Sequence, residues 1–270
     1  MSNNMYEKEI KEMTVMTAVF FQRLMENKDV AQEMLRVIVS DDKLIVREVV
    51  AERQVHDLYG RSVRLDALCV LGNGKECNIE IQNADDDDHV KRVRYNASLL
   101  TANRTIKGSK FAEIPSLLMV YVTSFDLFGL NRNIYHAHMS LTDEGTDNMI
   151  VDDGLDVIYV NTAVKDGTTL SELLECFTQQ NVDNPKFPCL SREVQRYKND
   201  EQAMDELAEV IEERDVKQRA IGDAMRIVAS VENIMEQADF TLEEACNLIK
   251  VTLEEYNDSK EILSQICESD

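Results

Sequence analysis

Apolar residues along the chain change from helical spacing to short strand-like runs, and then back to helical spacing. Residues 5–39 carry them at the three- and four-residue intervals of amphipathic helices. Short β-rich runs follow, and strands are expected at 44–55, 63–71, 75–82, 116–123, 134–141 and 155–160. Further helices are expected at 89–106 and 170–179, and almost throughout after residue 191. The pattern predicts an α/β core followed by a helical tail.

The character of the sequence changes after Pro185 and Pro188, beyond which acidic helical segments dominate. Two capping boxes, Thr241 with Glu244 and Thr252 with Glu255, predict the starts of short helices. We therefore expect a core with N-terminal helices at 1–200 and an acidic helical tail at 201–270. The tail carries apolar stripes that predict a core or a homo-oligomer contact through helices, at Met204, Leu207, Val210, Ile211, Met225, Val228 and Met235.

Composition places the chain among ordinary globular proteins. No stretch approaches 18 uncharged apolar residues, so no membrane span is expected, and the charged N-terminus does not resemble a secretory signal. The six cysteines are scattered and form no Cys-x-x-Cys pair. That distribution is typical of reduced thiols and predicts a cytoplasmic protein.

The formal net charge of −22 argues against nucleic-acid binding, because phosphate contacts favour basic surfaces. The charge is unevenly distributed, however. Residues 201–270 hold 19 acidic and 6 basic side chains, whereas residues 89–110 hold six basic side chains and no acidic one. A local basic surface therefore remains available for a polyanion.

The turn signal Gly72-Asn73-Gly74 separates two of the expected strands. A three-residue loop makes Leu71 face Lys75 and sets Asp66 opposite Glu80. One face of the hairpin is then apolar almost throughout, and the other carries the polar residues. A two-residue loop would place the apolar face of one strand against the polar face of the other, so the pattern selects the three-residue loop.

Two directly opposed carboxylates destabilise a sheet unless something neutralises them. A hard divalent cation such as Mg²⁺ or Mn²⁺, which takes oxygen ligands, is one solution for Asp66 and Glu80. An ordinary surface ion pair with the neighbouring Arg64 is the other. The hairpin geometry by itself leaves both solutions open.

The order of residues around the hairpin is characteristic. The segment GRSVRLDALCVLGNGKECNIEIQ (60–82) is followed by KRVRYNASLL (91–100), Lys107-Gly108 and MVYVTSFDLFG (119–129). This order resembles the core of the PD-(D/E)XK nuclease superfamily, and more narrowly the bacterial recombination-promoting nuclease and transposase-like family. The resemblance covers about residues 15–200. It implies a restriction-endonuclease-like α/β core, a mixed central sheet flanked by helices, with a C-terminal helical extension.

The resemblance also implies roles for individual residues. Asp66 and Glu80 match the carboxylates that bind Mg²⁺ or Mn²⁺, and the backbone carbonyl of Ile81 would be a third ligand. Gln82 stands where the superfamily pattern has lysine, and would position the attacking water without supplying charge. The cationic role is then left to Lys91, Arg92 or Arg94 on the following helix.

The basic segment after the hairpin predicts contacts with the DNA backbone and little reading of bases. The residues expected to make them are Lys91, Arg92, Arg94, Tyr95, Arg104 and Lys107. Arg92 and Tyr95 share one helical face. Either both hold phosphate there, or Tyr95 is a half-buried packing residue and Arg92 lies at its edge. Glu48 as a further metal ligand and the pair His136 and His138 as a metal site are weaker candidates, because surface positions explain them better.

The leading hypothesis is a metal-dependent DNA endonuclease that hydrolyses phosphodiester bonds. The alternative, motivated by Gln82 and the acidic surface, is a non-catalytic DNA-binding or assembly protein on a degenerate nuclease fold. A third hypothesis makes the acidic tail a DNA mimic that covers the basic helix and restrains activity.

Overall fold

The computed structural model describes residues 3–55, 63–85, 88–142, 148–238 and 240–269. The helices in this part of the chain are α1 (Asn3–Glu12), α2 (Ala18–Met25), α3 (Lys28–Val39), α4 (His89–Arg104), the short 3₁₀ helix η1 (Phe111–Glu113), α5 (Thr169–Phe177), α6 (Pro188–Asn199), α7 (Glu201–Ala238), α8 (Leu242–Leu248) and α9 (Leu253–Ser269). The strands are β1 (Val46–Val55), β2 (Val63–Leu71), β3 (Glu76–Gln82), β4 (Leu117–Thr123), β5 (Ile134–Ala137), β6 (Ser140–Leu141), β7 (Met149–Ile150) and β8 (Leu155–Asn161).

Six strands form one mixed sheet in the order β1-β2-β3-β4-β8-β5. Strands β2 and β3 pair antiparallel, β3, β4 and β8 run parallel, and β5 closes the edge antiparallel to β8. All seven residues of the central strand β4 are buried, as expected for a strand covered on both faces. This sheet with its flanking and C-terminal helices confirms the predicted restriction-endonuclease-like α/β architecture.

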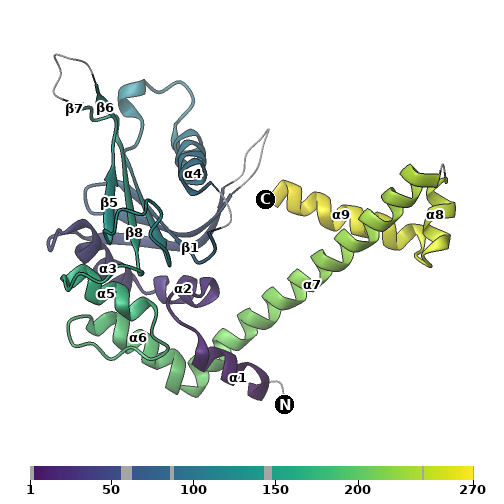
Figure 1. The fold of residues 1–270 in the computed structure, drawn as a ribbon, viewed down its shortest axis with the longest axis horizontal. Coiled ribbons are helices and arrows are strands. Elements are labelled where there is room, and N and C mark those ends of the chain that lie inside the picture. The colour runs from purple at the N-terminus through teal and green to yellow at the C-terminus, as the bar shows by residue number, and fades with distance from the viewer. Residues whose placement is uncertain (1–2, 56–62, 86–87, 143–147, 239, 270) are drawn as a thin grey trace. The chain divides into compact units, whose positions relative to one another are not determined.

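Figure 1 shows how the helices cover the sheet. Helix α4 lies against one face, whereas α2, α3, α5 and α6 gather on the other. The side chains between these helices and the sheet are the largest fully buried ones, among them Phe20, Phe21, Phe177 and Phe187. The two faces of the sheet are therefore covered by different parts of the chain, and α4 reaches the polar face of the hairpin, where Arg104 pairs with Glu76.

Two predicted elements differ from the observed ones. The helical region 5–39 is broken into three helices, and the Asn27 side chain starts the third by accepting a hydrogen bond from the Asp29 backbone N–H at 3.0 Å. The strand expected over 134–141 divides into β5 and β6, and β6 pairs with β7 in a separate two-stranded ribbon. Strands of two residues are too short to produce an alternating pattern, which is why the sequence did not predict β7.

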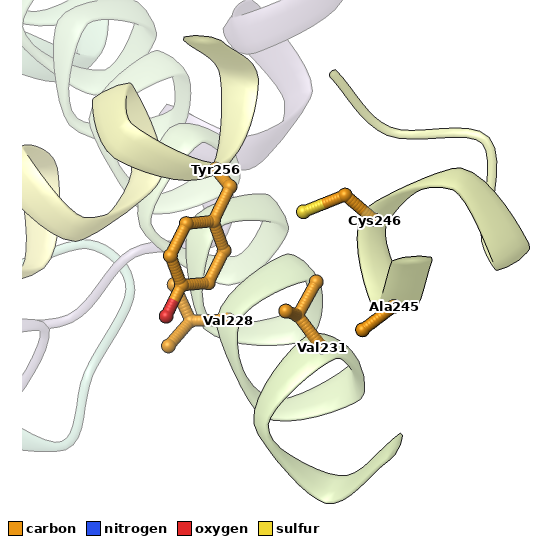
Figure 2. Close-up of a cluster of buried hydrophobic side chains, with 5 residues drawn as sticks. All are labelled: Val228, Val231, Ala245, Cys246 and Tyr256. Atoms are coloured by element: carbon orange, nitrogen blue, oxygen red, sulfur yellow. The ribbon is translucent and has the colours of Figure 1, made fainter. Parts of the chain in front are cut away.

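The chain separates into two compact units, of which the first contains the sheet and the second contains everything from Glu209 to the C-terminus. The second unit has its own small core, drawn in Figure 2, where Val228 and Val231 of α7 pack against Ala245, Cys246 and Tyr256. Part of the apolar stripe of the tail is thus used within the chain. No helix in the described residues is long and apolar enough to cross a membrane.

A buried lysine joins the N-terminal helix α1 to α6. The ammonium of Lys198 donates to the backbone carbonyls of Ile10, Lys11 and Met13 at the end of α1, and it lies 4.9 Å from the centre of the Phe20 ring. The side chain is almost fully buried. The cation therefore donates to three carbonyls at the end of α1, of which that of Ile10 also accepts from the Met13 N–H at 3.2 Å.

We expect Lys198→Met to lower the free energy of unfolding by about 2–4 kcal/mol, because it removes the buried ammonium that donates to these carbonyls. Thermal unfolding at pH 7 measures the loss. Burial lowers the pKa of Lys198 to about 8, so the ammonium is still largely charged at that pH. The matched control is Lys186→Met, which removes an exposed pair with Glu172 and should cost less than about 1 kcal/mol. Equal losses for the two variants would contradict this account.

Candidate metal centre on the β2–β3 hairpin

The turn between β2 and β3 has the register predicted from the sequence. The Gly74 N–H donates to the Leu71 carbonyl at 2.9 Å, and the Leu71 N–H donates to the Lys75 carbonyl at 2.9 Å. Gly74 has a φ of 86°, a conformation that disfavours other residues. The paired residues beyond the turn are Val70 with Glu76, Cys69 with Cys77, Leu68 with Asn78, and Ala67 with Ile79. The three-residue loop is confirmed, and Asp66 and Glu80 are the next residues along this ladder.

The predicted apolar face of the hairpin is buried, since Leu65, Cys69, Cys77 and Ile79 have no exposed surface. The polar face is also largely removed from solvent. Asn78 is fully buried, and the side chain of Glu80 is 4% exposed. Burial of this carboxyl group under α4 is hard to reconcile with an ordinary surface ion pair, and the Arg64 side chain proposed for that pair lies outside the described part of the structure.

Asp66 and Glu80 accept hydrogen bonds from residues of α2 and β3. Asp66 accepts one hydrogen bond from the Ile81 backbone N–H at 3.0 Å and another from the Gln22 side chain of α2 at 3.2 Å. Glu80 accepts one from the Asn78 amide at 2.9 Å. The Asp66 carboxylate thus lies against the peptide of Ile81, the residue whose carbonyl was predicted as the third metal ligand.

The surroundings of Glu80 disfavour the charged form of its carboxyl group. Burial is the largest cause that raises the pKa of Glu80 from 4.5 to about 8, and the negative charge of Asp66 contributes in the same direction. The hydrogen bond from Asn78 and the positive charge of Arg92 act in the opposite direction and lower it. The influence of Asp66 on this pKa means that the two carboxyl groups are close enough to interact strongly.

The donor set fits a hard divalent ion such as Mg²⁺. Such ions are held by one or two carboxylates and keep water or phosphate in their other positions. Within the described residues, no group of three or more histidine, cysteine, aspartate or glutamate side chains could hold a metal, so a closed site of the zinc type is not formed there. The Asn78 side-chain oxygen, buried beside Glu80 without a hydrogen-bond donor, could accept from a metal-bound water.

Arg92 contacts Gln82, the residue that stands where the superfamily pattern has lysine. The Gln82 amide nitrogen donates to the Ala84 carbonyl, and its oxygen lies 3.4 Å from a guanidinium nitrogen of Arg92. Among the three cations that the sequence offered for this role, Arg92 is the one that contacts Gln82. Lys91 instead pairs with Asp88, the residue that caps α4, and the charge of Arg94 also acts on Asp88.

The other residues predicted to contact nucleic acid are spread along α4 and beyond it. Lys91, Arg94, Tyr95 and Lys107 are exposed. Arg104, at the end of the helix, is half-buried and forms an ion pair with Glu76 at 2.9 Å, so its charge is already partly neutralised by the protein. Helix α4 therefore presents its cations mainly at its first turn and in the loop that follows it.

Three residues near the carboxylates were not assigned a role from the sequence. Gln22 comes from α2, and no local pattern links that helix to the hairpin. His89 is buried at the start of α4, with its Nδ1 atom 2.9 Å from the hydroxyl oxygen of Tyr121. Tyr121 is paired with Glu80 in the parallel register of β3 and β4. This histidine and tyrosine fix the first turn of α4 over the polar face, beside the carboxylates.

The weaker candidates lie away from the hairpin carboxylates. Glu48 is exposed on β1. His136 and His138 are exposed and line a cleft of about 570 Å³ on the opposite face of the sheet, together with Lys75 and Asp156, whose side chains form an ion pair. This cleft and the carboxylate pair are thus different places in the molecule.

Comparison with known proteins gives one result. The family model described as PD-(D/E)XK nuclease family transposase matches residues 17–177, which include the whole hairpin, α4 and the parallel strands. No curated protein and no solved structure matches the chain.

Proposed function

Because the chain belongs to the PD-(D/E)XK nuclease family transposases, we propose that it is a metal-dependent endonuclease that hydrolyses phosphodiester bonds in DNA. The observation that supports this most strongly is the buried carboxylate pair of the hairpin. Its charges repel each other and raise the pKa of Glu80, and a divalent ion would remove that repulsion. Mg²⁺ or Mn²⁺ is the proposed cofactor.

In this proposal, Asp66, Glu80 and the backbone carbonyl of Ile81 hold the ion. When bound, the ion would supply an acidified water and neutralise charge on the phosphate. Gln82 orients the attacking water by hydrogen bonding. The guanidinium of Arg92 adds the positive charge that glutamine lacks, beside the oxygens that become more negative as the bond to the sugar oxygen breaks.

The DNA backbone would lie along the exposed side of α4. Lys91, Arg94 and Lys107 are the proposed phosphate contacts, with Tyr95 beside them on the same exposed side. Arg104 contributes less, because Glu76 already pairs with it. Contacts of this kind position a duplex without reading its sequence, so we propose DNA cleavage with little base preference.

We further propose that residues 1–200 form the nuclease domain and that residues 201–270 form an acidic helical appendage. Apolar residues of the appendage that stay exposed, such as Met225, are suited to self-association through helices. The free thiols of the five described cysteines support a reducing, cytoplasmic location.

Cleavage of supercoiled plasmid tests the proposal. We expect nicking or linearisation with Mg²⁺ or Mn²⁺ and none with EDTA, and calorimetry should detect Mn²⁺ binding by the DNA-free protein. Glu48→Ala is a matched control, since it removes an exposed carboxylate of the same sheet and should leave both results unchanged. Cleavage that persists in EDTA, or a protein that neither binds Mn²⁺ nor cuts, would contradict the proposal.

The same experiment addresses the alternative of a non-catalytic DNA-binding or assembly protein. Gln82 in place of the superfamily lysine favours that alternative, because a neutral amide cannot stabilise developing charge. A degenerate site should bind DNA while failing to bind Mn²⁺. Binding of Mn²⁺ that depends on Glu80 would instead support the nuclease.

A further inference from the structure

The loop between α4 and β4 exposes large apolar side chains to solvent. The side chain of Phe111 is 91% exposed and that of Ile106 is 77% exposed. An aromatic ring in this position loses the free energy that its burial would otherwise provide. Single exposed apolar side chains are common on protein surfaces, so the surroundings of this ring decide what it can bind.

The loop holds these side chains in a defined conformation. The Ser109 N–H donates to the Ile106 carbonyl at 3.0 Å, and Gly108 has a φ of 88°. Glu113 closes the short helix η1 by accepting from the Lys110 backbone N–H at 3.2 Å. The Phe111 ring is therefore presented by a hydrogen-bonded loop, so little ordering is required when a partner binds.

The charges around the ring favour a polyanion. Lys107 and Lys110 precede it in the sequence and are exposed, and Glu113 follows it by two residues. No acidic residue occurs from residue 89 to residue 112, although the chain as a whole carries a net charge of −22. Basic side chains interleaved with an exposed aromatic ring are the combination with which proteins bind single-stranded nucleic acid.

Two side-chain contacts show which end of α4 lies beside which end of β3. Arg92 in the first turn of α4 contacts Gln82 at one end of β3, and Arg104 in the last turn pairs with Glu76 at the other end. The 16-residue helix is about 24 Å long. The loop therefore begins at the end of α4 that lies beside Glu76, whereas Arg92 lies at the other end of the helix, beside Gln82.

We propose that Ile106, Lys107, Lys110 and Phe111 form a binding site for unpaired DNA bases, with the Phe111 ring stacking on a base. This inference rests on the proposed function in taking DNA as the ligand. Rise along a DNA strand is about 3.4 Å per nucleotide in a duplex and larger when bases are unstacked. The stacked base would therefore lie several nucleotides from the phosphate that is cut. The preferred substrate is DNA with an unpaired segment at that distance.

Binding measured in EDTA, where no strand is cut, tests the inference. The probes are a 30-base-pair duplex and the same duplex with a five-nucleotide unpaired bubble. We expect the wild-type protein to bind the bubble DNA more tightly. Phe111→Ser should weaken binding to the bubble DNA by about 5- to 100-fold and binding to the duplex by less than about twofold, whereas Phe111→Trp should retain the preference. A 2-aminopurine base placed in the bubble should be quenched by the wild-type protein and not by Phe111→Ser.

The control variant is Ile150→Ser, which removes an exposed apolar side chain from β7 and should bind both DNAs as the wild type does. Equal affinity of wild type and Phe111→Ser for the bubble DNA overturns the inference. So does a change of sedimentation coefficient without a change in DNA binding, which would make Phe111 a contact between copies of the chain. Plasmid cleavage reports separately on the proposed function. If the protein cuts plasmid with Mn²⁺ but Phe111→Ser does not change DNA binding, the nuclease proposal stands and the base-binding site is refuted. If the protein prefers the bubble DNA through Phe111 but does not cut, the base-binding site stands and the nuclease proposal is refuted.

Discussion

Asp66→Ala and Glu80→Gln are each expected to lower DNA cleavage about 10³-fold or more, while they change the stability of the metal-free protein in opposite directions. Loss of either carboxylate removes a ligand of the proposed ion, and a thousandfold loss corresponds to about 4 kcal/mol of transition-state stabilisation. The opposite effects on stability follow from the different contacts of the two side chains.

Glu80→Gln should stabilise the metal-free protein at high pH. The pKa of Glu80 is raised to about 8 in the fold and is ordinary, near 4.5, in the unfolded chain. The native state therefore favours the protonated group. The resulting stability is fully present below pH 4.5 and is lost as the pH rises through 8. Glutamine stays neutral at every pH, so the variant should be more stable than the wild type by about 2–4 kcal/mol at pH 9 and similar to it near pH 4.5.

Asp66→Ala should instead destabilise the protein. The Asp66 carboxylate accepts from the Ile81 backbone N–H and from the Gln22 amide, and alanine leaves both donors without this acceptor. Unsatisfied donors of this kind cost about 1–3 kcal/mol. Part of the loss is offset at high pH, because removing the neighbouring negative charge also lowers the pKa of Glu80.

Thermal unfolding in EDTA between pH 4.5 and 9, followed by the same series with Mn²⁺, measures these effects. Mn²⁺ should raise the melting temperature of the wild type most strongly above pH 8, where Glu80 is ionised, and should leave Glu80→Gln unchanged. A Glu80→Gln protein that melts below the wild type at pH 9 without metal would show that this carboxyl group is not under the repulsion described above.

Arg92→Gln is expected to reduce the rate of cleavage about 10²- to 10³-fold with a much smaller effect on DNA affinity. The guanidinium lies beside Gln82 and acts on Glu80, so its charge is placed to stabilise the transition state rather than to hold the duplex. The matched control is Arg94→Gln on the same helix turn, which should change DNA affinity by a few-fold and leave the rate at saturating DNA unchanged. Single-turnover cleavage at several DNA concentrations separates the two effects.

A compensating substitution gives a stricter test. Gln82→Lys places a cation where the superfamily pattern has one, and in the Arg92→Gln background it should recover part of the lost rate. Recovery would indicate that arginine on α4 performs the role usually given to the strand residue. No recovery, together with equal effects of the Arg92 and Arg94 variants, would contradict the assignment of the positive charge to Arg92.

The hairpin was predictable from the sequence because its geometry is local. A glycine-flanked turn and alternating side chains determine which residues oppose one another, and the pairing of Ala67 with Ile79 agrees with that argument. The family resemblance then implied that Asp66 and Glu80 are metal ligands. Neither source of information required knowledge of the rest of the fold.

The surroundings of the hairpin depend on packing between distant segments, and the sequence did not determine them. Gln22 reaches Asp66 from α2, and the burial of Glu80 depends on how α4 lies on the sheet. The choice of Arg92 among three neighbouring cations follows from the rotation of α4 about its axis, which is fixed by the contact of His89 with Tyr121. The exposure of Phe111 was also not predictable, since an aromatic residue near a strand would ordinarily be assigned to the core.

The compact carboxylate hairpin has a consequence for how this chemistry can be inherited. Both proposed ligand side chains and the turn between them occupy one uninterrupted stretch of polypeptide, so a gene segment encoding residues 60–82 transfers the complete acidic pair in one recombination event. Gln22 and Arg92 are encoded outside that segment. An exchange among relatives would thus carry both proposed ligands together, whereas Gln22 and Arg92, which contact Asp66 and Gln82, would come from the recipient chain.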